Sequence, residues 1–369
     1  MKKKLLFLVS SMEGGGAERV AAMLCNHWSK CDYDVTLMAT YSKRGTCKHV
    51  LDDDVKLVFL ADIVNSRTDS MYMKIIRTFR LRKYIKDARP EYIVSFLTNV
   101  NIGAIISSLG LNIPVFASER TYPPFNNWPI LYNILRRLFY PRATCIIMQT
   151  QDGMNWLENA ISSATGSIIE NPVIHPLPIP NKRASNNLTN RKILLSVARL
   201  SKEKNIDMII KAFNALKNKH HDWDLVILGE GSERKKLESL IDKNHLHDRV
   251  HLVGRTSDPD FWYNQASVFI MYSKFEGFPN ALVEAMSYGL PVISSRCKTG
   301  PEDILTNHEN GLLVELISNP AKLQDAIEFM ITNPKHALKM GEAAKVVREH
   351  YTIQKISNKW FMAFERSTK

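Results

Sequence analysis

Two glutamates stand on either side of a predicted helix start in the second half of the chain. Glu276 follows the apolar segment 268–273, and Glu284 lies inside a helix that Pro279 is suited to open and Gly289 to close. Amide groups in the first turn of a helix attract anions, and carboxylates accept hydrogen bonds from sugar hydroxyls. The spacing predicts a site for a phosphorylated sugar ligand. The alternative is that each glutamate only complements the helix dipole.

Three consecutive glycines form a second candidate site near the start of the chain. Gly14, Gly15 and Gly16 follow the apolar segment 4–10 and precede a helix predicted from Ala17. Glycines let a phosphate approach the backbone closely, at the helix end that favours negative charge. The spacing is not GxGxxG and no GK[ST] follows, which disfavours a dinucleotide site and a P-loop. A tight strand-to-helix turn without a ligand is the alternative.

Positive charge is concentrated in the first half of the chain. The 369 residues include 49 Lys and Arg against 37 Asp and Glu, a formal net charge of +12, and residues 67–151 hold twelve basic and four acidic residues. This surplus favours an anionic partner, such as a phosphorylated ligand or a membrane surface. Nucleic acid is the less favoured partner because no nucleic-acid-binding motif is recognisable.

A helix predicted over residues 71–89, before Pro90, carries a row of cations. At 100° per residue, Lys74, Arg77 and Arg80 fall within one sector of the helix. If the second half of the helix packs by its apolar side, this row points toward the protein interior or the cleft, where buried cations need anions to face them. The row therefore predicts a site for the diphosphate of an acceptor. A solvated basic face on a broken helix is the alternative.

A second helix in this region, predicted over residues 128–140, mixes aromatic, aliphatic and cationic residues. This composition is typical of a helix that lies in a membrane interface. Together with the basic surplus, it predicts a peripheral protein on an anionic membrane surface. A core helix whose arginines reach solvent is the alternative.

The elements that must position these residues alternate between short apolar runs and helical patterns throughout. The pattern predicts an α/β fold with two Rossmann-like doubly wound domains facing an interdomain cleft. A proline-rich tract separates an N-terminal domain at 1–172 and a linker at 173–190 from a C-terminal domain at 191–350, and we expect a helix at 351–369 to pack back on the first domain. The uncharged segment Tyr92–Ser118 spans 27 residues, but its glycines, asparagines and proline favour a buried strand–helix–strand unit over a transmembrane helix.

Metal chemistry is disfavoured by the distribution of the possible ligands. The five cysteines are scattered without a CxxC pair, and the eleven histidines show no ligand spacing. The only acidic run, Asp52 to Asp54, lies in a predicted turn far in sequence from the paired glutamates. We therefore expect neither a metal nor another cofactor.

Several motifs together resemble a known family. The segment EGFPNALVEAM followed by SYGLPVISS resembles the E-x7-E region of the family 4 glycosyltransferases, retaining GT-B enzymes that use nucleotide sugars. Further segments match in the expected order: the glycine loop, SVARLSKEKN, LGEGSERKKLE, LVGRTSDP and CKTGPED. The resemblance covers essentially the whole chain.

The resemblance implies roles for individual residues. Glu276 would contact the transferred sugar while Arg199 and Lys204 clamp the donor diphosphate, and these three would be the catalytic residues. Glu284 would bind the ribose hydroxyls. The other implied donor-binding residues are Gly15, Gly16, Gly229, Arg255, Gly277, Phe278, Pro279, Asn280, Ala281 and Leu282.

This sequence departs from the family pattern at two places. Asn205 stands where the family usually has glycine after the lysine, and no histidine occurs at the usual position near Ser118. We expect Glu119 or Arg120 to line the acceptor site instead, together with Gly14.

The resemblance also implies a substrate class. We expect a retaining, metal-independent hexosyltransferase that moves a hexose or N-acetylhexosamine, with N-acetylgalactosamine favoured, from a UDP-sugar to a polyprenyl-diphosphate-linked saccharide. The enzyme would act in the cytoplasm, on the inner face of the cytoplasmic membrane. A GT-B sugar-nucleotide epimerase and a non-enzymatic anion-binding protein are the alternatives.

Overall fold

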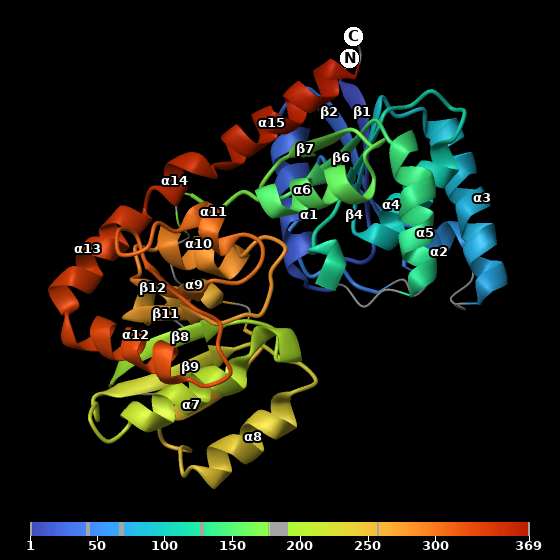
Figure 1. The fold of residues 1–369 in the computed structure, drawn as a ribbon. Helices are drawn as coiled ribbons and strands as arrows, with labels where there is room; N and C mark the ends of the chain where they lie inside the picture. The colour runs from blue at the N-terminus through green and yellow to red at the C-terminus, as the bar shows by residue number, and fades with distance from the viewer. Residues whose placement is uncertain are drawn as a thin grey trace. The chain divides into compact units, whose positions relative to one another are not determined.

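The computed structural model describes residues 2–41, 45–65, 70–125, 129–175, 177, 191–256 and 258–367. The chain divides into two compact units, residues 1–172 with 353–369, and residues 173–352. Each unit is built around a parallel sheet flanked by helices, which confirms the prediction of two Rossmann-like domains (Figure 1). The predicted linker at 173–190 lies mostly outside the described residues.

The first unit contains a seven-stranded sheet in the order β3-β2-β1-β4-β5-β6-β7, with every neighbouring pair parallel. Parallel strands end at the same edge of a sheet, so the residues after each strand gather there. The strands are β1 (Lys3–Val9), β2 (Tyr33–Ala39), β3 (Lys56–Phe59), β4 (Tyr92–Phe96), β5 (Val115–Ser118), β6 (Cys145–Met148) and β7 (Gly166–Ile168).

Helices cover both faces of this sheet because its strands are buried on both sides. Leu6 and Leu8 pack in the core beneath one set of helices, whereas Phe7 between them packs against Trp28 and Phe96 on the opposite face. The helices are α1 (Gly16–Ser29), α2 (Leu60–Val64), α3 (Met71–Ala88), α4 (Thr98–Ser108), α5 (Ile130–Phe139) and α6 (Gln151–Ala160), with short 3-10 turns η1 (Pro123–Phe125) and η2 (Tyr140–Arg142).

The C-terminal helix α15 (Ile353–Arg366) belongs to the first unit, so that both ends of the chain lie there (Figure 1). The ring of Phe364 stacks on Tyr92 of β4 at 4.7 Å between centroids. The indole of Trp28 in α1 donates a 3.0 Å hydrogen bond to the Ser357 hydroxyl. Lys359 forms an ion pair with Glu170.

The second unit contains a six-stranded parallel sheet in the order β10-β9-β8-β11-β12-β13. Its strands are β8 (Lys192–Val197), β9 (Trp223–Leu228), β10 (Val250–Gly254), β11 (Val268–Met271), β12 (Val292–Ser295) and β13 (Leu312–Val314). Its helices are η4 (Lys202–Lys204), α7 (Ile206–Leu216), α8 (Arg234–Lys243), α9 (Pro259–Gln265), α10 (Asn280–Ser287), α11 (Pro301–Ile304), α12 (Ala321–Thr332), α13 (Pro334–Ala344) and α14 (Val347–His350).

The uncharged segment 92–118 forms β4, α4 and β5, as predicted. The three elements are short and buried, and Leu97 and Asn112 adopt positive φ angles of 53° or more where the chain turns between them. Within the described residues, no helix has both the length and the hydropathy needed to cross a membrane.

Candidate functional site

Glu276 lies in the loop between β11 and α10 and is almost completely buried. Each of its carboxylate oxygens accepts a hydrogen bond from Lys204 Nζ, at 2.7 and 2.6 Å. Lys204 comes from η4, which follows β8, so the two residues meet because β8 and β11 are neighbours in the sheet. About 20% of the lysine side chain remains exposed, and a ligand can therefore reach the ammonium group. The structure thus brings together two of the three predicted catalytic residues.

The loop that carries Glu276 is supported by residues to which the sequence assigned no role. The Thr299 hydroxyl donates a hydrogen bond to the backbone carbonyl of Glu276. Gly300 has φ of 96°, and a Cβ on it would lie 2.5 Å from Pro279 Cδ. Glycine is required at this position because any side chain would push away the residue that precedes α10. The sequence did not identify Gly300 because its positive φ angle is visible only in the structure.

Both ends of α10 match the prediction, since Pro279 caps its start and Gly289 follows its end with φ of 75°. Its amide groups are less available than expected. The Asn280 N–H donates to the Phe278 carbonyl at 2.9 Å, and the Leu282 N–H donates to the Pro279 carbonyl at 3.0 Å. These two amides are therefore not free donors for a phosphate. The Leu282 side chain is fully buried and faces the core.

Glu284 lies one turn inside α10, beside two tyrosines that the sequence analysis did not identify. Its carboxylate accepts a 3.0 Å hydrogen bond from the Tyr263 hydroxyl. Tyr263 stacks on Tyr288, whose hydroxyl donates to Asp260 at 2.6 Å. Burial, followed by the effect of Asp260, raises the pKa of Tyr288 well above its usual value. Tyr288 therefore stays protonated, and the hydrogen bond from Tyr263 orients the Glu284 carboxylate.

Arg199 and Arg255 are both exposed at the ends of strands, after β8 and β10 respectively. Within the described residues, the Arg199 guanidinium makes no hydrogen bond or ion pair, so its planar donor group is available to an anion. Gly229 has a structural reason to be glycine, because a Cβ at its φ of 136° would lie 1.9 Å from the Ala198 carbonyl oxygen. The structure therefore explains Gly229 by packing alone.

At the glycine loop of the first unit, a carboxylate of the protein itself lies where the sequence predicted a bound anion. Gly14 has φ of 115° and needs to be glycine for that reason. The carboxylate of Glu18 lies at the start of α1, where it accepts hydrogen bonds from the Gly15 N–H and the Ser11 hydroxyl. This negative charge already complements the helix dipole and would repel a phosphate. The prediction that Gly15 and Gly16 bind a donor anion is therefore not supported by this geometry.

Glu119, predicted to line the acceptor site, is instead buried in an ion pair. Its carboxylate accepts hydrogen bonds from Arg136 Nε at 2.9 Å, from Thr98 at 2.9 Å and from the Tyr140 hydroxyl. Glu119 and Arg136 are each 1% exposed. Burial, then the negative charge of Glu119, raises the pKa of Tyr140. The prediction for Glu119 is wrong because the residue faces α5 and not solvent.

Arg120 points to the opposite face of the sheet from Glu119, as successive residues of an extended chain do. Its guanidinium lies 3.3 Å from the centre of the Phe96 ring, and Nη1 donates to Asn171 Oδ1 at 2.6 Å. Gln149 donates to the same oxygen at 2.6 Å. Burial lowers the pKa of Arg120 well below its usual value. The residue lies at the carboxyl edge of the sheet, where its predicted acceptor role stays a prediction.

The predicted row of cations on α3 is divided by its packing. The helix is continuous from Met71 to Ala88, and Leu81 and Ile85 are buried against the core. Arg77 lies one turn before Leu81 on the same face and is buried, whereas Lys74 and Arg80 are exposed. The expectation that all three cations point inward is wrong because Lys74 and Arg80 lie to either side of the buried strip that Arg77 shares with Leu81 and Ile85.

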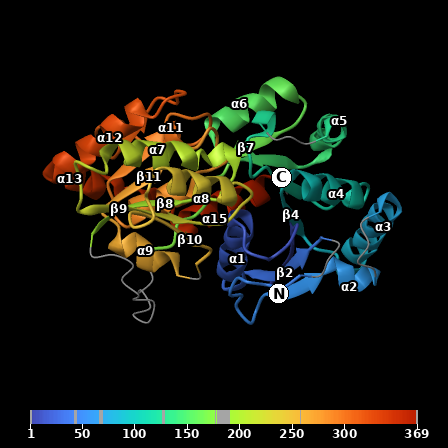
Figure 2. The same ribbon diagram turned by 90° about the horizontal axis from the view of Figure 1, so that it is seen from below.

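The helix predicted over residues 128–140 is α5, and Trp128 lies outside the described residues. The ion pair of Arg136 with Glu119 holds one face of α5 against the core, and the opposite face points outward. Four large apolar side chains on that face are between 49% and 78% exposed: Ile130, Leu131, Ile134 and Leu138. Helices α3, α4 and α5 lie side by side (Figures 1 and 2), with α4 contacting both others. The exposed residues Tyr72 and Phe79 add apolar surface on α3.

The described residues contain no group of three His, Cys, Asp or Glu side chains that could hold a metal ion. In the acidic run, Asp52 pairs with Lys30 at 2.7 Å and its N–H bonds to Asn26. None of the five cysteines forms a disulfide bond. Burial raises the pKa of Cys297 to about 12, so this thiol near Glu276 stays protonated.

Two protein-family models match the chain. "Glycosyltransferase Family 4" matches residues 14–175, and "Glycosyl transferases group 1" matches residues 178–347. The two matches correspond closely to the two units, and together they leave few residues uncovered.

Known proteins resemble the chain over nearly its whole length. GalNAc-alpha-(1->4)-GalNAc-alpha-(1->3)-diNAcBac-PP-undecaprenol alpha-1,4-N-acetyl-D-galactosaminyltransferase of Campylobacter jejuni is 26% identical over 97% of both chains. N-acetylgalactosamine-N,N'-diacetylbacillosaminyl-diphospho-undecaprenol 4-alpha-N-acetylgalactosaminyltransferase of the same species is 29% identical over 90% of this chain and 91% of its own. The crystal structure of Anabaena Alr3699/HepE in complex with UDP shares the fold, with a TM-score of 0.79, 16% identity, and coverage of 99% of this chain and 100% of its own.

Proposed function

We propose, from the premise that the chain belongs to the GT-B glycosyltransferases, that it transfers a hexose or N-acetylhexosamine from a UDP-sugar to a polyprenyl-diphosphate-linked saccharide. N-acetylgalactosamine is the proposed sugar because both Campylobacter relatives transfer it by name to undecaprenol-linked saccharides. The product would enter bacterial surface or protein-linked glycan synthesis. Transfer would retain the anomeric configuration, as the resemblance implies.

The arrangement of charge before α10 carries this proposal. When the sugar leaves a nucleotide donor, negative charge develops on the diphosphate, and fixed positive groups stabilise it. Arg199 has a guanidinium that no described residue binds, and Lys204 has an ammonium group that is shared with Glu276. A diphosphate that draws Lys204 away would free the Glu276 carboxylate to accept sugar hydroxyls. Two cations supply this charge without a metal, and activity should therefore persist in EDTA.

The first unit supports the membrane part of the proposal. The apolar face of α5 is uncovered within the described residues, and exposed cations such as Arg137, Lys74 and Arg80 lie on α5 and α3. Apolar side chains enter the boundary between headgroups and acyl chains while nearby cations attract anionic lipids. We propose peripheral attachment of this face to the cytoplasmic leaflet, where a polyprenyl-diphosphate acceptor resides.

The test is a transfer assay with a panel of UDP-sugars and synthetic polyprenyl-diphosphate saccharides, analysed by mass spectrometry. We expect a glycolipid heavier by one or more sugars, together with free UDP, and an α-linkage in the NMR spectrum of the product. Glu276→Gln should strongly reduce the amount of product, and Glu309→Gln, which alters an exposed carboxylate in the same unit, should not. A changed sugar nucleotide without any glycolipid would indicate an epimerase and overturn the proposal.

A further inference from the structure

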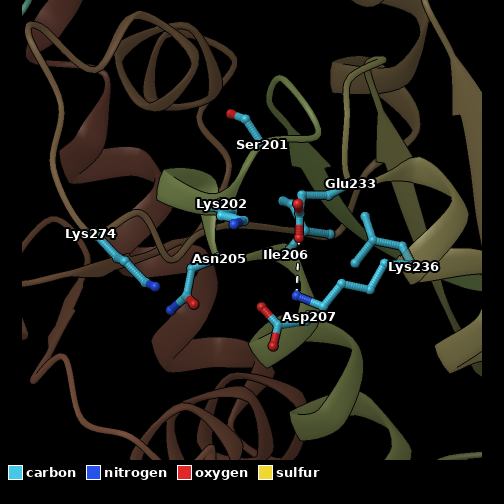
Figure 3. A pocket seen from close by; sticks show the side chains of 9 residues that line it. Ser201, Lys202, Asn205, Ile206, Asp207, Glu233, Lys236 and Lys274 are labelled. Atoms are coloured by element: carbon cyan, nitrogen blue, oxygen red, sulfur yellow. Dashed lines mark hydrogen bonds and ion pairs between the residues drawn. The ribbon is translucent and has the colours of Figure 1, made fainter. Parts of the chain in front are cut away.

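A second charged pocket lies in the second unit, beside the turn that carries Lys204. The cavity has a volume of about 160 Å³, room for about five waters at roughly 30 Å³ each. Figure 3 shows the side chains that line it. They come from the turn before α7, the start of α8 and the loop after β11: Ser201, Lys202, Asn205, Ile206, Asp207, Glu233, Lys236, Leu237 and Lys274.

Asn205 is the residue that marks this pocket as a binding site. It is 8% exposed and adopts φ of 55° and ψ of 33°, a left-handed conformation in which the resembled family usually has glycine. Its side chain lines the cavity (Figure 3) and forms no hydrogen bond with any described residue. The amide group is therefore open to a ligand or water in the cavity.

The charges around Asn205 leave a positive surplus. Asp207 pairs with Lys211 at 2.8 Å, and Glu233 pairs with Lys236 at 3.0 Å. Lys202 and Lys274 have no carboxylate partner within the described part of the chain. Both carboxylates of the pocket are therefore neutralised, whereas two ammonium groups are not.

The backbone adds to this positive character. Asn205 precedes the first turn of α7, an eleven-residue helix, and its carbonyl accepts the Met208 N–H at 3.1 Å, so the opening donors are the N–H groups of Ile206 and Asp207. The positive end of the helix dipole therefore points to the same side as the Asn205 amide. We propose that this pocket binds an oxyanion of the phosphate class, held by Asn205, Lys202, Lys274 and the first turn of α7.

This site is separate from the proposed donor site but shares its framework. The Lys274 N–H donates to the Glu203 carbonyl at 2.7 Å, which ties the loop before Glu276 to the turn before α7. Lys204 leaves this turn toward Glu276, whereas Asn205 lines the pocket. The inference does not require that the chain transfers sugars, because it rests on the pocket alone.

The test titrates inorganic phosphate into the full-length chain by calorimetry, with UDP present in saturating amounts to fill the donor site. We expect one saturable site. Asn205→Gly removes the amide and suits the left-handed backbone, so the fold is retained, and it should weaken phosphate binding about tenfold. Lys274→Gln should weaken it by a similar factor, whereas Lys322→Gln, an exposed lysine on α12, should not.

A second arm identifies the source of the phosphate. Vesicles of phosphatidylglycerol in phosphatidylcholine are sedimented with the wild type and with Asn205→Gly. Weaker vesicle binding of the variant assigns the pocket to a lipid headgroup, and unchanged vesicle binding with weakened phosphate binding assigns it to free phosphate. Phosphate binding that is absent, or that both pocket variants leave unchanged, overturns the proposal. If UDP itself fails to bind, the proposed function fails, but the same phosphate titration without UDP still decides the pocket.

Discussion

Each unit of this protein contains a glutamate paired with a cation, and the two pairs differ in their contact with water. Glu119 and Arg136 in the first unit are each 1% exposed and are held by Thr98 and a tyrosine. The pair formed by Glu276 and Lys204 in the second unit leaves the lysine partly exposed. An ion pair that is closed to water cannot exchange its partner for a ligand, whereas a pair whose lysine is partly exposed can. The same residue chemistry therefore supports the fold in one unit and, in the proposed function, binds the donor in the other.

The largest expected effect comes from breaking the pair that is closed to water. Arg136→Leu leaves the buried Glu119 carboxylate without its cation, which should lower the free energy of unfolding by about 3–5 kcal/mol. Urea denaturation of the variant measures this loss. Arg137→Leu, which alters an exposed neighbour, should change stability little, and the double variant Glu119→Gln/Arg136→Leu should recover part of the loss. Equal stabilities for the Arg136 and Arg137 variants would show that the pair does not support the fold.

Breaking the pair of Glu276 and Lys204 should reduce activity strongly and stability only slightly. Glu276→Gln should reduce kcat by roughly 10² to 10³, equivalent to about 2.7–4 kcal/mol, if its contacts form mainly in the transition state. The unfolding free energy should fall by about 1 kcal/mol or less because Lys204 can turn to water. Glu284→Gln should also impair transfer, because the variant would bind the ribose hydroxyls of the donor more weakly. Near wild-type turnover in both variants would remove these glutamates from the mechanism.

A smaller effect is expected from the Arg199 guanidinium. Arg199→Ala removes a charged donor that makes no hydrogen bond or ion pair with any described residue, so UDP-sugar affinity should fall about tenfold, or 1.4 kcal/mol, without loss of stability. Calorimetry with UDP measures this change, and Lys335→Ala on α13 is the matched control. Affinity that stays the same in the Arg199 variant would contradict its role in binding the diphosphate.

The last expected effect concerns membrane binding by α5, which Arg136 holds with its apolar face outward. Replacing Ile134 and Leu138 with Ser should weaken binding to vesicles that contain phosphatidylglycerol, because each buried aliphatic side chain contributes at most about 1.5–3 kcal/mol. Leu338→Ser, an exposed leucine on α13, serves as the control. Vesicle sedimentation that does not distinguish these variants would exclude α5 as the membrane contact.

Local patterns in the sequence determined much of the architecture. The alternation of short apolar runs with helical segments identified two parallel sheets, and Pro279 and Gly289 set the ends of α10 within a residue. The segment 92–118 was predicted as strand, helix and strand, which are β4, α4 and β5, from its apolar runs and from the glycines, asparagines and proline between them. These features depend on backbone conformation and on neighbours close in sequence, which residue types report directly.

The partners of individual side chains were decided only by tertiary structure. Glu119 and Arg120 are adjacent in the sequence, yet they point to opposite faces of the sheet, and one meets Arg136 while the other meets Phe96. The glycine loop was predicted to hold an anion, but Glu18 already places a carboxylate there. Each outcome depends on which distant strand or helix supplies the neighbouring group, because burial and pairing are properties of the packed sheet and not of the residue type.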